Sequence, residues 1–176
     1  MTTQGRFIAI ETVAHTPQQI QHALQRDLHR ADVHIVTTPS LGDLGRLQAE
    51  RAAEQPNWLE RIYGGLADLH DFVECEGGIL SLIQQGQHVI CIGYRLSLGA
   101  ANLHSDNQFG WYQVTSQQLL VPDVSLIVGG DDAQSLRLSH LSEADPQAEI
   151  LNGISEDWQP LIDKIASLLT TDGGAN

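Results

Sequence analysis

The first forty residues constrain the fold more than any other part of the chain. Residues 6–13, RFIAIETV, are rich in Phe, Ile and Val and predict a buried strand. After it, Thr16 suits a helix N-cap and Pro17 suits the first helical position. Apolar residues then recur at helical spacing at Ile20, Ala23, Leu24, Leu28 and Ala31. Residues 32–38, DVHIVTT, predict a second strand, so the chain should open with a right-handed βαβ unit whose two strands are parallel.

In the middle of the chain, the spacing of apolar residues first predicts helices and then changes to the two-residue alternation of a strand. Residues 41–70 read as helical with a break at Pro56. Beyond it, HVICIGYRLSL alternates apolar residues with others from Val89 to Leu98, which predicts a strand about ten residues long. The segments FGWYQVTS, VSLIV and SLRLSHL predict further strands, and the Gly-Gly-Asp-Asp sequence at 129–132 predicts a turn that joins the last two in a hairpin.

These elements together predict an α+β fold. It has a βαβ opening, central helices, a largely antiparallel (mixed) sheet from about residue 79 to 141, and a C-terminal helix that begins near Ser155 and packs on the sheet. A chain of 176 residues is long enough for one self-sufficient core, so residues 1–170 are predicted to form a single globular domain and residues 171–176 a frayed tail.

Charge and composition exclude several classes of function. The net charge is −13, and residues 62–176 carry 15 acids against three bases. With a single lysine, Lys164, the chain is a poor candidate for nucleic acid or anionic lipid, and a partner with a basic surface fits better. No apolar run reaches the roughly 18 residues of a membrane span, and the start lacks a secretion signal, which predicts a cytoplasmic protein. The sequence has no Walker-type loop and no Gly-rich dinucleotide fingerprint, so it gives nucleotide binding no support.

Residues 86–102 carry the most suggestive chemistry, around Cys91. Gly86 would end the helix GILSLIQQ, VIC would form a strand, and Cys91-Ile92-Gly93 supplies a C-x-G sequence. This stretch resembles the nucleophile region of the class I glutamine amidotransferase-like superfamily, whose cysteine lies on a tight turn between a strand and a helix. The resemblance implies a cysteine-dependent hydrolase or amidotransferase, with His104 or His140 as the base for Cys91. The alternation from Val89 to Leu98 favours the other interpretation, in which Cys91 lies inside a plain strand.

A second cluster, DLHDFVECE at residues 68–76, suggests a metal site. On a helix, His70 and Glu74 lie one turn apart and would share a metal with Cys75. The spacing matches no established metal motif, and a solvated acidic helix end accounts for the same residues. We therefore predict no metal and no cofactor, and keep this set as the alternative.

The sequence favours a protein that acts by binding another protein. The predicted function is a non-catalytic adaptor, regulatory or immunity-type protein with an acidic surface, and the amidotransferase-like enzyme is the alternative. Trp111 and Tyr112, an aromatic pair beside a polar loop, are the predicted binding residues because interfaces use such side chains as anchors. An exposed edge strand would also permit a homodimer.

Overall fold

A computed structural model describes residues 4–13, 17–52, 54, 56–129, 132–151 and 157–170. Its centre is a five-stranded sheet with the order β2-β3-β1-β4-β5, and every neighbouring pair is parallel. The strands are β1 (Phe7–Thr12), β2 (Val33–Thr37), β3 (His88–Ile92), β4 (Val124–Val128) and β5 (Ala148–Leu151). The helices are α1 (Pro17–Asp27), α2 (Asp43–Ala52), α3 (Trp58–Glu74), α4 (Ile79–Gln84), α5 (Arg95–Asn102), α6 (Asp106–Ser116), α7 (Ala133–Ser142) and α8 (Gln159–Thr170). The fold is therefore α/β, and the prediction of a largely antiparallel sheet was wrong.

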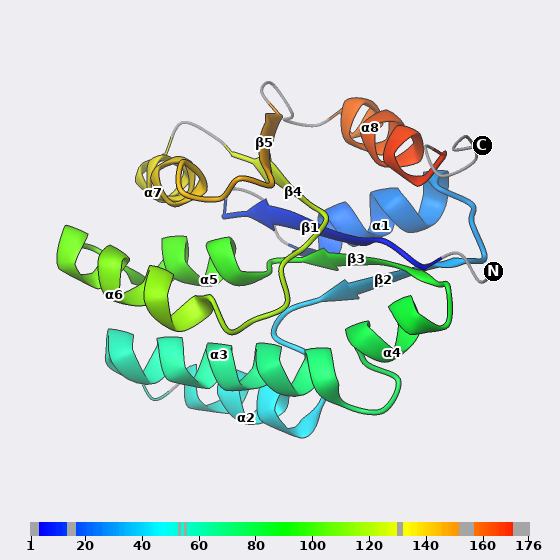
Figure 1. Ribbon diagram of the computed structural model, residues 1–176. Coiled ribbons are helices and arrows are strands. Elements are labelled where there is room, and N and C mark those ends of the chain that lie inside the picture. Colours follow the sequence, from blue (N-terminus) through cyan, green and yellow to red (C-terminus); the bar gives the residue numbers. More distant parts are fainter. Residues whose placement is uncertain are drawn as a thin grey trace.

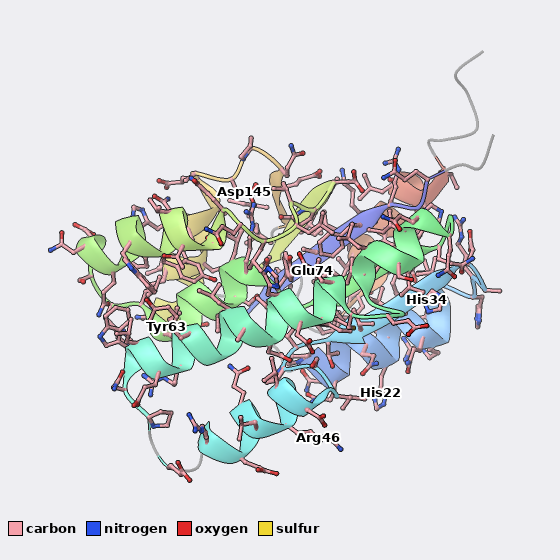
Figure 2. The ribbon with its side chains drawn as sticks, turned by 60° about the horizontal axis from the view of Figure 1, so that its bottom comes forward. His22, His34, Arg46, Tyr63, Glu74 and Asp145 are labelled. Carbon is pink, nitrogen blue, oxygen red and sulfur yellow. The ribbon has the colours of Figure 1, made fainter. Side chains whose placement is uncertain are left out.

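Helices cover both faces of the sheet (Figure 1). On one face α1 and α8 pack against the isoleucines of β1 and β3, such as Ile10 and Ile92. On the other face α3 and α4 cover Ala9 and Cys91, and α5, α6 and α7 pack around Ile127. Because both faces are covered, β1 is buried along its whole length, which explains why its sequence is an almost continuous apolar run. Helix α2 lies alongside α3, on the outside of this layer (Figures 1 and 2).

The βαβ opening is confirmed: β1 and β2 lie in one parallel sheet and α1 connects them. Pro17 is the first residue of α1, as its place in the sequence predicted, while the N-cap residue Thr16 lies outside the described residues. The two strands are not neighbours, because β3 lies between them and pairs with both. This insertion makes the later β3 a central strand, which the opening sequence alone does not reveal.

Three segments predicted as strands contain helices instead. The strand predicted from Val89 to Leu98 ends at Ile92, because Gly93 turns the chain at a φ of +84°, where an added Cβ would lie 2.9 Å from Thr38 Oγ1. Helix α5 follows and buries Leu96 and Ala100 at helical spacing. FGWYQVTS lies in α6 and SLRLSHL in α7, so the predicted meander and hairpin were also wrong.

The physical reason for these errors is that a short alternation also fits one face of a helix. In α7, Leu136 and Leu138 alternate in sequence, yet Leu138 is buried with Leu141 while Leu136 is 68% exposed. Asp132 begins this helix by accepting hydrogen bonds from the backbone N–H groups of Gln134 and Ser135. Of the predicted turn, Gly130 and Asp131 lie outside the described residues.

Helices α2 and α3, separated by Pro56, and the C-terminal helix α8 agree with the sequence-based expectation. Ser155 and the predicted tail at 171–176 lie outside the described residues, and β5 was not anticipated. No described helix is long and apolar enough to cross a membrane.

Candidate functional site at the carboxyl ends of the strands

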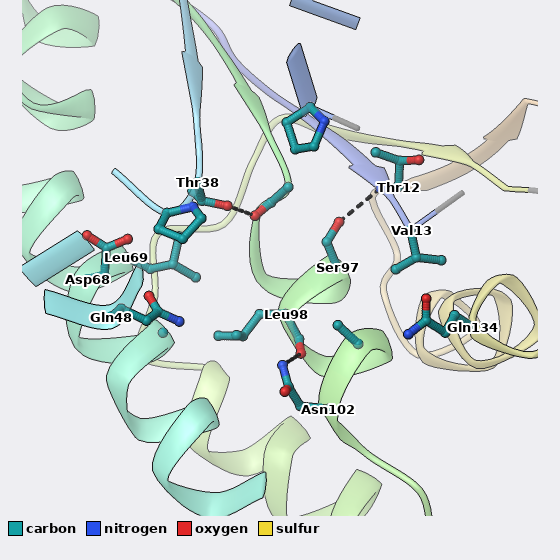
Figure 3. Close-up of a pocket in the computed structure, with 15 residues that line it drawn as sticks. Thr12, Val13, Thr38, Gln48, Asp68, Leu69, Ser97, Leu98, Asn102 and Gln134 are labelled. Atoms are coloured by element: carbon teal, nitrogen blue, oxygen red, sulfur yellow. Dashed lines mark hydrogen bonds between the residues drawn. The ribbon is translucent and has the colours of Figure 1, made fainter. Parts of the chain in front are cut away.

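A cavity of about 410 Å³ opens where β1, β2 and β3 end. Thr12, Thr38 and Gly93, which lie at or just after these strand ends, form part of its wall (Figure 3). Its volume lies within the range of about 300–1,000 Å³ common for small-molecule sites.

The topology explains why a cavity forms at this place. The chain leaves β1 through α1 on one face of the sheet, and leaves β3 through α5 on the opposite face. The two connections diverge at the carboxyl ends of adjacent parallel strands, and such a switch point leaves a crevice in which ligands of open α/β sheets bind.

Glu11, near the end of β1, is fully buried beneath this region and holds the start of α5 in place. Its carboxylate accepts hydrogen bonds from the backbone N–H of Leu96 at 3.1 Å and of Ser97 at 2.8 Å, and from Ser97 Oγ at 2.6 Å. Burial raises the pKa of Glu11, and the hydrogen bonds from Ser97 and Leu96 and the charge of Arg95 oppose that rise. The side chain therefore occupies the N-terminus of α5, where backbone donors and the helix dipole favour an anion.

Thr12, the last residue of β1, lines the cavity and, within the described part of the chain, has a hydroxyl group without a partner. Its backbone N–H donates to Ser97 Oγ at 2.9 Å, as Figure 3 shows. Its own hydroxyl, Oγ1, is buried and has no hydrogen-bond partner among the described residues. Since a buried hydroxyl without a partner costs about 1–3 kcal/mol, this group would gain from contact with a ligand, for which the Thr12 side chain would have to turn toward the cavity.

The far wall comes from α2, α3 and the turn after β2. Asp68 of α3 is 1% exposed and accepts hydrogen bonds from the backbone N–H of Ser40 at 2.8 Å and from Ser40 Oγ at 2.5 Å. Thr38 Oγ1 donates to the carbonyl of Gly93, which fastens the end of β2 to the turn after β3. The Thr38–Pro39 peptide bond, which enters this turn, is cis.

Side-chain amides supply the remaining polar groups. Asn102 of α5 donates to the carbonyl of Leu98 at 2.8 Å and accepts from Arg61 Nε at 2.7 Å. Gln48 and Gln134 line opposite sides of the cavity (Figure 3), and neither side-chain amide has a hydrogen-bond partner among the described residues. An amide offers both a donor and an acceptor, which suits a ligand with amide-like or hydroxyl edges.

Asp68 is the one charged residue in the described wall of the cavity, and no Lys or Arg is part of that wall. Three cations near this wall are engaged with other groups. Arg95 forms a buried ion pair with Asp145 at 2.9 Å, Arg61 contacts Asn102 and the carbonyl of Pro56, and Arg137 donates to the carbonyl of Ala100.

A second, larger cavity of about 870 Å³ lies between α2 and α3. It shares Gln48 and Asn102 with the first, so the two adjoin. Its wall includes the exposed apolar side chains Leu44, Leu47 and Tyr63, together with Arg51 and Arg61; Figure 2 shows Tyr63 toward the start of α3.

Cys91 lies in β3, is fully buried and packs against α3 and α4. The strand-to-helix turn that the amidotransferase resemblance implies does exist, but it falls at Gly93, two residues after the cysteine. Burial raises the pKa of the Cys91 thiol well above its ordinary value, so the thiol is not activated as a nucleophile. The histidines suggested as bases, His104 and His140, are exposed residues after α5 and in α7.

The predicted binding pair lies in α6, and its two side chains differ in environment. Tyr112 is 1% exposed and donates its hydroxyl to the carbonyl of Arg95 at 2.5 Å. Trp111 is half-buried and makes edge contacts with Trp58 and Tyr63, at ring-centroid distances of 5.8 and 5.5 Å. Binding of a partner by this pair stays a prediction.

The alternative metal set lies at the end of α3. His70 Nε2 and Glu74 Oε1 are 3.7 Å apart, and the exposed Cys75 caps the helix, its backbone N–H donating to Asp71. Among the described residues, no group of three or more His, Cys, Asp or Glu side chains is placed to hold a metal ion.

The fold defines a class, that of α/β proteins with an open parallel sheet, and the cavity lies at the switch point of that sheet. Solved structures with a similar fold include thymidylate kinases. The thymidylate kinase of Ehrlichia chaffeensis superposes with a TM-score of 0.72 at 14% identity, covering 94% of this chain and 99% of that chain. The thymidylate kinase of Candida albicans gives a TM-score of 0.67 at 16% identity, covering 96% of this chain and 91% of that one. At these identities the likeness shows the fold alone. No protein-family model matches the sequence, and no curated protein matches it.

These comparisons correct the predicted function. The two solved structures named above are thymidylate kinases, which overturns the prediction of a non-catalytic protein-binding or regulatory protein. They also overturn the amidotransferase-like alternative, in agreement with the mid-strand position of Cys91.

The cavity itself was missed at the sequence level. Thr12, Thr38, Ser97 and Gln134 come from four separate segments. The one local signal is that Thr12 and Thr38 end apolar runs, and it points to a site only once β1 and β2 are known to be parallel.

Proposed function

We propose that this protein binds a nucleoside-type small molecule in the cavity at the carboxyl ends of β1 and β3. The observation that supports this most is the position of the cavity at the switch point, with Thr12 and the side-chain amides of Gln48 and Gln134 in its wall. The fold likeness adds the chemical class, because the solved structures act on thymidylate, a nucleotide with a pyrimidine base and a sugar.

The composition of the wall suits such a ligand. Leu69, Leu98 and Ala101 offer apolar surface for the flat faces of a base, and the neighbouring amides can hydrogen-bond its edge. A cytoplasmic location, which the sequence predicts, would give the protein access to free nucleosides.

The proposal concerns binding and does not include phosphoryl transfer by a Walker-type loop. In kinases with such a loop, glycines and a lysine between a strand and a helix cradle the phosphates. The corresponding sequence here, from Glu11 to Gln18, is ETVAHTPQ and contains neither glycine nor lysine.

Titration calorimetry with thymidine and with thymidylate tests the proposal. We expect saturable one-to-one binding of at least one of the two, and loss of that binding in Ala101→Trp, because Ala101 is an exposed residue of the wall and an indole there would fill the entrance. Ala49→Trp is the matched control, since Ala49 is also exposed on a helix but lies outside both cavities. Absence of binding by either compound, or equal loss in both variants, would refute the proposal.

A further inference from the structure

We infer that the cavity selects an uncharged ligand, so that thymidine binds more tightly than thymidylate. This inference rests on the proposed function and deepens it by naming the chemical class. It depends on the charges around the cavity, which are a property of this chain's own residues.

The described wall of the cavity carries no positive charge. Phosphate groups are bound by Arg, Lys or clustered backbone N–H groups, and the described wall has neither Arg nor Lys. Residues 14–16, which join the wall residues Val13 and Pro17 in sequence, are Ala, His and Thr and add neither. Three of the nearby arginines, Arg61, Arg95 and Arg137, are held by hydrogen bonds or an ion pair to other groups, so recruiting one of them would break an existing contact.

The start of α1 is the place where a strand-loop-helix unit would bind a phosphate. A helix N-terminus binds phosphate through backbone N–H donors at its first residues. Here the first helical residue is Pro17, which has no N–H and so removes one of these donors. The other helix start beneath the cavity, that of α5, is already occupied by the carboxyl group of Glu11.

The charge that the described wall does carry is negative and would repel a phosphate. Asp68 is buried in the wall with both carboxylate oxygens facing Ser40 donors, and the whole chain carries a net charge of −13. A phosphate monoester adds about −1.5 to −2 charges at pH 7 and would be repelled. The groups left unpaired, the Thr12 hydroxyl and the amides of Gln48 and Gln134, are all neutral.

The test compares the dissociation constants of thymidine and thymidylate at low ionic strength. We expect thymidine to bind at least tenfold more tightly. The part of the exclusion that comes from exposed charges should shrink as NaCl is raised toward 1 M, where such charges are screened over about 3 Å; the part that comes from the buried Asp68 is screened much less. A preference for thymidine that neither changes with salt nor falls when a lysine is placed in the wall would mean that shape rather than charge excludes the phosphate, and would overturn the inference.

A charge-changing variant provides the reciprocal experiment. Gln134 lies in the wall on the exposed first turn of α7, so Gln134→Lys should tighten thymidylate at least fivefold relative to thymidine. Leu136→Lys, on the same helix but outside the wall and 68% exposed, is the matched control and should change neither. If thymidylate binds the unmodified protein as tightly as thymidine, the inference fails and the proposed function stands; if neither compound binds, both fail.

Discussion

The hydroxyl of Thr12 gives the sharpest quantitative prediction, because stability and binding should respond to its removal in opposite directions. In the ligand-free protein this hydroxyl is buried without a partner, at a cost of about 1–3 kcal/mol. Thr12→Val replaces the hydroxyl by a methyl group of nearly the same shape and keeps a β-branched residue in the central strand. We therefore expect the ligand-free variant to be more stable than the unmodified protein by about 1 kcal/mol, which raises Tm by roughly 2–4 °C for a domain of this size.

Binding should respond in the opposite direction. If the Thr12 hydroxyl pairs with thymidine, its removal forfeits a hydrogen bond worth about 0.5–1.5 kcal/mol, so the dissociation constant should rise roughly 2- to 12-fold. The assays are thermal unfolding by circular dichroism without ligand, and titration calorimetry with thymidine.

Thr12→Ser is the matched control, since it keeps the hydroxyl and loses only the methyl group. It should lose stability and retain most of its affinity. A Tm that falls in Thr12→Val would show that the hydroxyl has a stabilising partner in the free protein. An unchanged thymidine affinity with a raised Tm would show that the hydroxyl does not face the ligand, and the reasoning about the site would fail at that point.

Two further predictions concern the core around the site. Ellman's reagent at pH 8 should modify one thiol rapidly in the native protein and two after denaturation, because Cys75 is exposed whereas burial raises the pKa of Cys91. Cys75→Ser should leave the native protein unreactive, and rapid labelling of that variant would contradict the burial of Cys91. Asp145→Asn should lower the free energy of unfolding in urea by about 3–5 kcal/mol, since it leaves Arg95 as an uncompensated buried charge. Adding Arg95→Met should recover part of that loss, and equal stability of the single and double variants would show that the pair is not coupled.

Local patterns in the sequence correctly predicted several elements of the fold. The opening strand, α1 and the second strand follow from runs of Ile and Val and from Pro17, and VSLIV forms β4. Prediction failed where one face of a helix repeats the alternation of a strand. In the segment from Val89 to Leu98, β3 and α5 share a single apolar alternation, and the boundary at Gly93 depends on its contact with Thr38, which is distant in sequence.

The candidate site could not be predicted from local sequence patterns, for a related reason. Its position depends on the strand order β2-β3-β1, and this order is set by parallel pairing between residues about 50 to 80 positions apart, such as Ile35 with Ile90 and Ile8 with Ile90. Once that order is known, Thr12 and Gly93 must end side by side on the same edge of the sheet. The sequence pattern of each strand is the same whichever neighbour it pairs with, so nothing local distinguishes this order from an antiparallel meander.

The fold produces the cavity, whereas the charges of the side chains in its wall determine which ligands the cavity can bind. Parallel pairing and the divergence of α1 and α5 produce a crevice whatever side chains line it. Binding of phosphate needs in addition a donor-rich loop or a cation. This chain has ETVAHTPQ from the end of β1 to the start of α1, a carboxyl group from Glu11 at the start of α5, and no Lys or Arg in the described wall. A chain can therefore share the fold of a nucleotide kinase while its cavity favours the neutral part of a nucleotide. Gln134→Lys tests whether charge alone accounts for the expected difference in affinity between thymidine and thymidylate.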